Sequence, residues 1–345
     1  MATLSLNALT KPFIIAEMSG NHNQSLERAL RIVDAAAESG VDAIKLQTYT
    51  ADTMTLDIAE REFFISNPES PWYGSSLYEL YERAHTPWAW QEKIFARARE
   101  HGLVCFSTPF DATSVDFLEK LGAPCYKIAS FENTDLPLIR KVAQTGKPLI
   151  VSTGMATVAD LDLLVRTARE NGCGDLTLLK CTSSYPATPR GSNILTIPHM
   201  KELFGCNVGL SDHTLGIGAA VASIALGATV IEKHFTLARA DGSVDSAFSM
   251  EPDEMAQLVR ECRAAWEALG EISYRVQPEE EKSLVFRRSL YIVEDMRAGD
   301  VITAENMRAI RPGCGLSPRY YDMLLGRRVG CDVRRGTPLS WELLM

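Results

Sequence analysis

Short apolar segments rich in β-forming residues recur along roughly the first 240 residues of this 345-residue chain. Segments with helical spacing separate most of them, and three of these, SLERALRIVDAAAESG, WQEKIFARAREHG and ADLDLLVRTARENG, end in glycine. Apolar strands that alternate with helices are typical of a parallel sheet buried on both faces. Eight such units predict a TIM (β/α)8 barrel, with a doubly wound open sheet as the alternative, although no GxGxxG motif follows the first strand. The eight apolar segments are residues 13–19, 43–49, 103–110, 125–130, 149–155, 176–182, 207–213 and 230–235.

The pattern changes after residue 250, where an amphipathic helix is followed by a charged segment without periodicity and then by short strands and turns. We therefore expect a TIM-barrel catalytic domain over residues 1–270, a linker over 271–288 and a small β-rich domain over 289–345. A domain of about 60 residues is near the lower limit for an independent core, so we expect it to lean on a partner surface. The Pro-, Trp- and Tyr-rich segment 50–89 predicts an elaborated loop and helix at the active-site end of the barrel.

Charge and cysteine usage narrow the class of protein. The chain has 35 basic and 44 acidic residues, a net charge of −9, which argues against binding to nucleic acid or to a membrane surface. A few lysines in a cleft can still attract a small anionic substrate. The eight cysteines form no CxxC pair, and neither a signal peptide nor an apolar stretch of membrane-spanning length is visible. We expect a cytoplasmic protein.

Polar residues end nearly all of the apolar segments, at the end of the strands where TIM barrels carry their chemistry. Lys45 and Gln47 share a face because they lie two residues apart, and so do Glu232 and His234. Burying such groups costs several kcal/mol unless they are paired or bind a ligand. The polar residues at these ends are Glu17, Asn21, Asn23, Lys45, Gln47, Thr108, Lys127, Ser130, Glu132, Ser152, Thr153, Thr182 to Tyr185, Ser211, His213 and His234.

The two histidines that end the seventh and eighth segments suggest a metal site. Ser211, Asp212 and His213 together invite comparison with a protease triad, but adjacent strand residues point to opposite faces and cannot form one. His213 and His234 end neighbouring strands, so their rings can converge on a divalent ion such as Mn²⁺, with Mg²⁺, Co²⁺, Zn²⁺ and Fe²⁺ as alternatives. Each histidine can instead be a hydrogen-bonded core residue.

The two lysines at the strand ends admit three interpretations. Lys45 and Lys127 can form ion pairs with Glu17 and Glu132 inside the barrel. They can also form a cradle for phosphate or carboxylate together with nearby hydroxyl groups. A Schiff-base lysine is the third interpretation, and a metal site would replace it as the means of activating a carbonyl.

Ten motifs in order along the chain resemble the nonulosonic (sialic) acid synthase family. They are AEMSGNHNQSLERAL, DAIKLQTY, FSTPFD, KIASFENTDLPLI, STGMA, CTSSYPA, GLSDHTLG, IEKHFTL, FRRSLY and IRPGCGLSP. The resemblance covers essentially the whole chain and implies that the C-terminal domain is similar to type III antifreeze protein. SLYELYERAHTPWAW, DSAFSMEPDEM and RRSLYIVEDMRAGDVIT resemble the branch of the family that makes pseudaminic acid rather than N-acetylneuraminate.

The resemblance implies condensation of phosphoenolpyruvate with an acetamido-sugar aldehyde and release of phosphate. It implies that His213 and His234 bind the metal and that Glu17 acts as acid or base. The residues implied to hold phosphoenolpyruvate are Lys45, Thr108, Lys127, Ser130, Ser152, Ser183 and Ser211. Those implied to hold the sugar are Gln47, Glu132, Tyr185, Asp245, Phe286 and Arg311. The last two would come from the partner in a domain-swapped homodimer. One departure is Ser183, which stands where the neuraminate branch has Asn.

Overall fold

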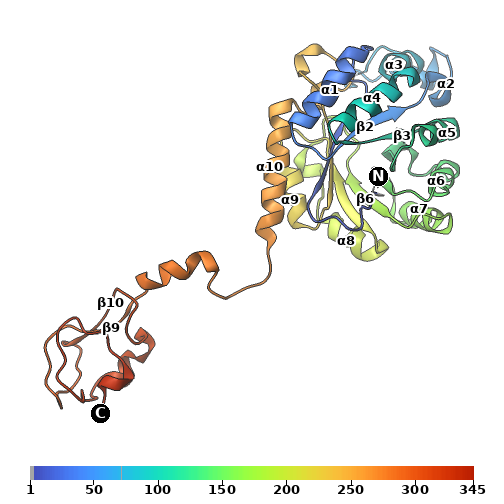
Figure 1. The fold of residues 1–345 in the computed structure, drawn as a ribbon. Coiled ribbons are helices and arrows are strands. Elements are labelled where there is room, and N and C mark those ends of the chain that lie inside the picture. Colours follow the sequence, from blue (N-terminus) through green and yellow to red (C-terminus); the bar gives the residue numbers. More distant parts are fainter. Residues whose placement is uncertain (1–3, 71) are drawn as a thin grey trace. The chain divides into compact units, whose positions relative to one another are not determined.

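Eight parallel strands close into a barrel in the order β1 to β8 in the computed structural model, which describes residues 4–70 and 72–345 (Figure 1). All eight predicted strand segments are confirmed, and so is the TIM barrel. Pairing of β1 with β8 closes the cylinder and sets Glu17 opposite His234. The strands are β1 (Phe13–Glu17), β2 (Ala43–Thr48), β3 (Val104–Pro109), β4 (Tyr126–Ile128), β5 (Leu149–Ser152), β6 (Leu176–Cys181), β7 (Asn207–Ser211) and β8 (Val230–His234).

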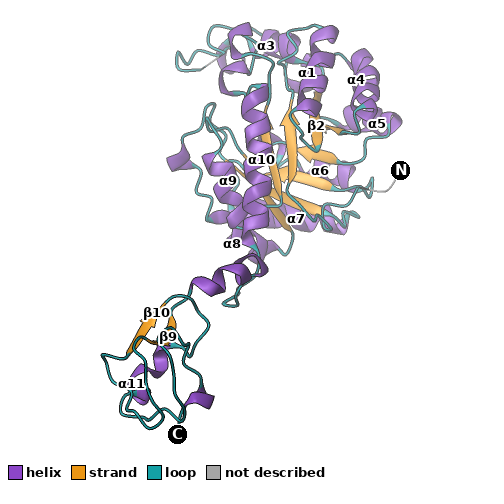
Figure 2. Ribbon diagram, turned by 60° about the vertical axis from the view of Figure 1, so that its left-hand side comes forward, coloured by secondary structure: helices purple, strands orange, loops and turns teal. Residues whose placement is uncertain are grey.

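Helices follow the strands and surround the barrel (Figure 2). The three helices predicted from glycine-terminated segments are confirmed as α1, α4 and α7. Each ends just before a glycine with positive φ, namely Gly40, Gly102 and Gly172, a conformation that only glycine adopts without strain. The surrounding helices are α1 (Leu26–Glu38), α4 (Trp88–Glu100), α5 (Ala112–Leu121), α6 (Leu136–Ala143), α7 (Val158–Glu170), α8 (Thr196–Phe204), α9 (Gly218–Ala225) and α10 (Pro252–Leu269). The segment between β2 and α4 carries α2 (Ala51–Met54) and α3 (Leu77–Ala84).

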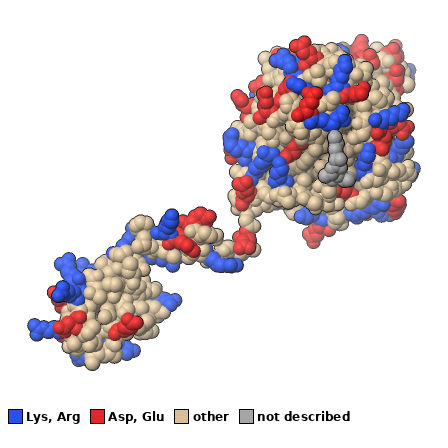
Figure 3. All heavy atoms as spheres, viewed as in Figure 1, with Lys and Arg blue, Asp and Glu red and all other residues tan. Residues whose placement is uncertain are grey.

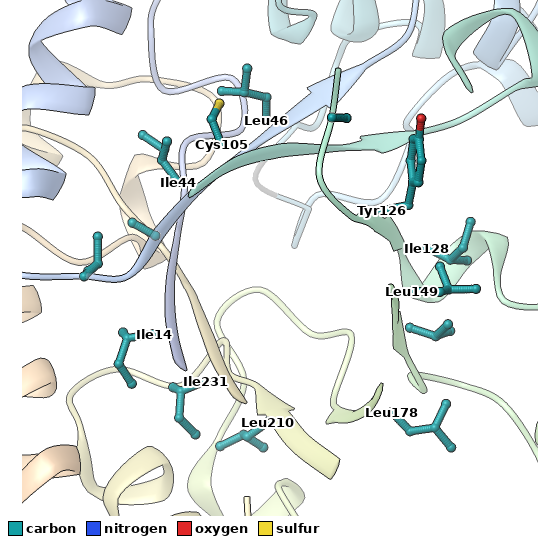
Figure 4. Close-up of a cluster of buried hydrophobic side chains, with 14 of the residues drawn as sticks. Ile14, Ile44, Leu46, Cys105, Tyr126, Ile128, Leu149, Leu178, Leu210 and Ile231 are labelled. Carbon is teal, nitrogen blue, oxygen red and sulfur yellow. The ribbon is translucent and has the colours of Figure 1, made fainter. Parts of the chain in front are cut away.

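Side chains alternate between the two faces of each strand and build two separate cores. The outward set packs between the barrel and the helices, and Figure 4 shows Ile14, Leu46 and Ile231 among its members. The inward set forms an apolar layer near the strands' N-terminal ends, and Leu6 from the N-terminal segment packs against it. Strand β7 contributes Gly209, where a Cβ atom would lie 2.1 Å from the carbonyl oxygen of β8 Val230. The other members of this lower layer on the strands are Phe13, Ile15, Ala43, Phe106, Cys125, Ile150, Leu179 and Val230.

The chain divides into two compact units, residues 1–270 and 271–345. In the second unit β9 (Ser289–Ile292) pairs antiparallel with β10 (Met307–Ile310), and α11 (Tyr321–Leu324) follows. Nine buried side chains, including Leu290 and Ile302, form its core. The prediction of a small β-rich C-terminal domain is confirmed.

The charged segment that precedes β9 is not wholly irregular. Residues 278–286 form a 3₁₀ helix, although the sequence shows no periodicity there. Pro278 at the first helical position and a capping box between Gln277 and Glu280 account for its start. Acidic and basic side chains are interspersed on the visible faces of both units (Figure 3). Over residues 4–70 and 72–345, no helix is both long and apolar enough to cross a membrane.

Candidate active site

A layer of polar side chains lies directly above the apolar layer inside the barrel. Each strand contributes one residue to this polar layer, and that residue comes two positions after the strand's residue in the lower layer. Lys45 comes two positions after Ala43, and Lys127 two positions after Cys125. All eight members are at most 5% exposed. Six of them line a cavity of about 380 Å³, a volume suited to small-molecule ligands. This upper layer consists of Glu17, Lys45, Thr108, Lys127, Ser152, Cys181, Ser211 and Glu232.

Two lysines and two glutamates form a connected ionic network in the upper layer. Lys45 Nζ lies 2.5 Å from Glu17 Oε2 and 3.9 Å from Glu232 Oε2. Lys127 Nζ lies 3.6 Å from Glu232 Oε1. The pairing of Lys45 with Glu17 matches the ion-pair interpretation, but Lys127 pairs with Glu232 and not with Glu132. Closure of the barrel explains the difference, because it turns Glu232 on β8 inward between the two lysines.

Hydroxyl groups add hydrogen bonds to this network, although Glu17 Oε1 and Glu232 Oε2 are buried without a hydrogen-bond partner. Lys45 donates to Thr108 Oγ1 at 3.2 Å, and Lys127 donates to Ser152 Oγ at 2.7 Å. Ser211 Oγ donates to Glu232 Oε1 at 3.0 Å. Thr108, Ser152 and Ser211 were each predicted for the phosphoenolpyruvate site, and the structure brings all three around the lysines.

The two network carboxyl groups have opposite pKa shifts. Burial raises the pKa of Glu17 to about 7, and the charge of Lys45 only partly offsets it. Burial also pushes the pKa of Glu232 upward, but Lys127 and Lys45 outweigh it, so that the pKa falls below its usual value. Of these two, Glu17 has the pKa in the range that acid-base catalysis near neutral pH requires. Glu232 remains an ionised counter-charge.

The two predicted metal ligands converge at the top of the cavity. His234 ends β8, whereas His213 lies two residues beyond the end of β7, and their ring centroids are 5.3 Å apart. Nδ1 of His213 donates to the carbonyl oxygen of Thr182 at 3.1 Å, so Nε2 carries the lone pair when the ring is neutral. Burial lowers the pKa of His213, but Cys181 and the Thr182 carbonyl oxygen outweigh it and raise the pKa above its usual value. Nδ1 of His234 is buried without a hydrogen-bond partner and lies 3.9 Å from Asp245 Oδ2.

These observations fit a divalent cation. Burial holds the pKa of His234 well below its usual value, so the ring is neutral and can donate a lone pair. Within the described part of the chain, no group of three or more His, Cys, Asp or Glu residues forms a complete metal site. Oxygen atoms from substrate or water would therefore have to complete the coordination shell, as in catalytic metal sites with open positions.

A glycine makes room for hydroxyl groups on one side of the cavity. Gly154 follows β5, and its N–H donates to Ser130 Oγ at 3.1 Å. A Cβ atom at this position would lie 2.2 Å from Ser183 Oγ and 2.6 Å from Ser130 Oγ. Asn133 holds the Gly154 backbone by donating to its carbonyl oxygen at 2.9 Å. The predicted pair Ser130 and Ser183 thus meets over the buried backbone of Gly154, in space that any larger residue would need for its side chain.

An aromatic wall closes the other side of the cavity. Tyr185 lies 4.5 Å from His213 and 5.1 Å from Phe248 between ring centroids, and 5.9 Å from Trp72. The Trp72 Nε1 atom donates to the carbonyl oxygen of Val244 at 3.1 Å. Trp72 belongs to the segment 50–89, so this segment does reach the cavity, as predicted.

Sequence reasoning left several cavity residues out of the predicted site. Trp72, Phe248, Ser19 and Cys181 all line the cavity, and so does Glu232. The sequence did contain an indication for Glu232, because it shares a strand face with the predicted site residue His234. Trp72 and Ser19 lie outside strands and helices, where no periodicity indicates which way a side chain points.

The predicted sugar-binding residues fall into two groups. Gln47, Glu132, Tyr185 and Asp245 all line the cavity. Asp245 accepts a hydrogen bond from Ser19, and burial raises its pKa. Burial likewise raises the pKa of Glu132 to about 7.

Phe286 and Arg311 belong to the second unit, whereas the cavity residues belong to the first. Phe286 is 64% exposed. Within their unit the two segments are joined, because the N–H of Gly313 donates to the carbonyl oxygen of Val285 at 2.8 Å.

Comparison with known proteins adds the family. Residues 32–274 match the NeuB family model, and residues 287–345 match the SAF domain. A pseudaminic acid synthase of Campylobacter jejuni is 43% identical over 97% of both chains. An N,N'-diacetyllegionaminic acid synthase of Legionella pneumophila is 37% identical over 96% of this chain and 94% of that protein.

A solved structure is also similar. The N-acetylneuraminic acid synthetase of Leptospira borgpetersenii, in complex with citrate, superposes with a TM-score of 0.71 at 29% identity, covering 80% of this chain and 90% of that one. The family model covers more than half of the chain, and the relatives match over nearly its full length. This chain belongs to the NeuB family.

Proposed function

We propose that this protein is a pseudaminic acid synthase. It would condense phosphoenolpyruvate with 2,4-diacetamido-2,4,6-trideoxy-β-L-altropyranose and water, giving pseudaminic acid and phosphate. The observation that carries the proposal is the buried upper layer, in which two lysines face an open cavity beneath two converging histidines. The 43% identity to a pseudaminic acid synthase, against 37% to a legionaminic acid synthase, favours this substrate.

The lysines and hydroxyl groups would bind the enolpyruvyl substrate. Lys45 and Lys127 supply two buried positive charges, balanced in the free protein by Glu17 and Glu232. A substrate with phosphate and carboxylate groups would add negative charge and favour protonation of Glu17. Ser130, which lines the cavity, and Ser183 beside it would donate hydrogen bonds to the substrate's oxygen atoms.

His213 and His234 would hold a divalent cation, most suitably Mn²⁺. Such an ion supplies Lewis acidity toward the open-chain aldehyde of the sugar. The hydrogen bond from His213 Nδ1 to Thr182 fixes the tautomer in which Nε2 faces the cavity. Asp245, 3.9 Å from His234 Nδ1, would orient the sugar or water beside the ion.

The bond changes in the proposed reaction are as follows. The C3 carbon of phosphoenolpyruvate attacks the aldehyde carbon, and water adds to the electron-deficient C2. Collapse of the resulting tetrahedral intermediate cleaves the C–O bond and releases phosphate. Glu17 would exchange a proton with the water or with a sugar hydroxyl group, because burial brings its pKa to about 7.

The second unit would complete the site of a neighbouring copy. The cavity is open, and Phe286 is 64% exposed in a segment that packs little within its own unit. Phe131, Met155 and Leu195 are exposed apolar side chains in loops after β4, β5 and β6. A domain-swapped homodimer that covers these loops would bring Phe286 and Arg311 to the sugar.

Phosphate release tests the reaction and the substrate together. The altrose derivative, the corresponding legionaminic acid precursor and N-acetylmannosamine are assayed in parallel with phosphoenolpyruvate. We expect turnover to be fastest with the altrose derivative. Faster turnover with another sugar would reassign the branch, and no release with any of them would reject the synthase function.

Chelation tests the metal. Dialysis against EDTA should abolish turnover, and Mn²⁺ should restore it. Full activity in the presence of chelator would instead favour the Schiff-base alternative, which borohydride would detect as a covalent adduct at Lys45 or Lys127.

A further inference from the structure

A buried ion pair connects the two strand ends that carry the histidines, on the outer face of the barrel. Lys233 lies between Glu232 and His234 on β8, so its side chain points away from the cavity. It is 1% exposed. Its Nζ atom donates to Asp212 Oδ2 at 2.8 Å, to the Thr214 carbonyl oxygen at 2.7 Å and to the Gly216 carbonyl oxygen at 3.0 Å. All three N–H donors of the ammonium group are therefore satisfied.

These three acceptors surround His213 in the chain. Strand β7 ends at Ser211 and α9 begins at Gly218, so His213 lies between them in a segment whose strand pairing is an isolated bridge of Thr214 with Ala187. Asp212 braces the segment a second time, because its Oδ1 accepts from the Thr214 N–H at 2.9 Å. Further supports are the bond of His213 Nδ1 to Thr182, the bond of the His213 carbonyl oxygen to the Ala187 N–H at 3.0 Å, and the bond of the Asp212 N–H to the Glu232 carbonyl oxygen on β8 at 2.9 Å.

We propose that Lys233 is a positioning residue that fixes His213 relative to His234 by fastening residues 212–216 to β8. The inference extends the metal role in the proposed function. Lys233 does not line the cavity, so it acts through the two histidines and not on substrate. A buried ion pair adds little net stability over apolar residues of similar size. An apolar side chain, however, could not form the three hydrogen bonds by which Lys233 holds this segment.

Three variants and a control test the proposal through binding of Mn²⁺ alone, measured by electron paramagnetic resonance. K233M removes all three bonds and should weaken Mn²⁺ binding about 10- to 100-fold, the usual effect of losing support around a ligand. D212N keeps a neutral acceptor for Lys233, so its effect should be smaller. The control is D42N, because Asp42 pairs with Lys11 at 2.6 Å at the start of β2, remote from the histidines.

The double variant D212N/K233M separates positioning from stability. It removes the unpaired carboxylate that K233M leaves buried, so its melting temperature should recover toward the wild-type value. Its Mn²⁺ affinity should stay low, because the carbonyl groups of Thr214 and Gly216 remain unheld. D42N should lower the melting temperature without changing Mn²⁺ affinity.

Two results would overturn the proposal. One is that K233M binds Mn²⁺ with wild-type affinity. The other is that the double variant recovers Mn²⁺ affinity as well as melting temperature. Histidine ring signals in nuclear magnetic resonance spectra of the metal-free protein give a second readout. The signals of His213 and His234 should shift in K233M and not in D42N. If the wild type binds no Mn²⁺, the metal role fails. The positioning role would still stand if the His213 and His234 signals shift in K233M. Unshifted signals would reject the positioning role as well.

Discussion

The lower and upper layers of the barrel interior come from the same strands but differ in chemistry. Below, Phe106, Ile150 and Leu179 pack with other apolar side chains. Two residues further along the same strands, Thr108, Ser152 and Cys181 belong to the upper layer, and the last two line the cavity. A shift of two residues along a strand therefore leads from an apolar core that stabilises the barrel to a site whose buried charges destabilise it.

This difference shows how the barrel tolerates a site that costs stability. The upper layer buries two lysines and two glutamates, and a buried charge is unfavourable unless it is paired. The lysines and glutamates pair with one another in the free protein, and the apolar layer beneath them excludes water from below. Substitutions in the two layers should therefore have opposite effects on stability and activity.

The largest effect on stability is expected from the lower layer. Phe106 is fully buried, and F106A would leave a cavity under the site. We expect the free energy of unfolding to fall by about 3–5 kcal/mol, measured by urea denaturation. The kcat of the molecules that remain folded should change little, because no polar group of the upper layer is removed.

T108V, two residues further along the same strand, is the matched variant for F106A. It removes the hydroxyl group that accepts a hydrogen bond from Lys45 and keeps the side-chain volume. Activity should fall, while the unfolding free energy changes by about 1 kcal/mol. If F106A impaired kcat as strongly as T108V, the two layers would not be functionally separate.

A smaller and pH-dependent effect is expected at Glu132. Its Oε2 atom is buried without a hydrogen-bond partner, and burial raises the pKa from 4.5 to about 7. The folded protein thus binds this proton more tightly than the unfolded chain. The resulting stability is fully present below pH 4.5 and is lost as the pH rises through 7.

E132Q lacks this loss of stability. We expect the variant to resemble the wild type near pH 4.5 and to exceed it above pH 7 by about 3 kcal/mol, measured by thermal unfolding across the pH range. Activity should fall at the same time, because the carboxylate is proposed to contact the sugar. A stability difference that does not depend on pH would contradict the raised pKa.

An effect on stability as small as that of T108V is expected at Gly154. G154A would place a methyl group against the hydroxyl groups of Ser183 and Ser130, which can rotate or shift. We expect a stability loss of about 1 kcal/mol and a rise of about tenfold in the KM for phosphoenolpyruvate.

G174A is the control for G154A, because the Cβ position at Gly174 has no neighbour within 4 Å. It should leave both the KM and the unfolding free energy nearly unchanged. An unaltered KM in G154A would remove Ser130 and Ser183 from the proposed binding site.

The sequence determined the alternation of strands and helices and the side chains that share a face. All eight strands were predicted because runs such as FIIAE and LIVS are apolar and short, and glycines stop the helices between them. The shared face of Glu232 and His234 also follows from the strand period of two, which is a local property of the chain.

Only the tertiary structure decided which side chains from different strands meet. Pairing of β1 with β8 sets Glu17 beside His234, and the closed cylinder turns Glu232 toward Lys127 in place of Glu132. Loop residues such as Trp72 reach the cavity through contacts with distant segments. Periodicity fixes the direction of a side chain within one element, whereas its neighbours depend on strand register and barrel closure, which join residues far apart in the sequence.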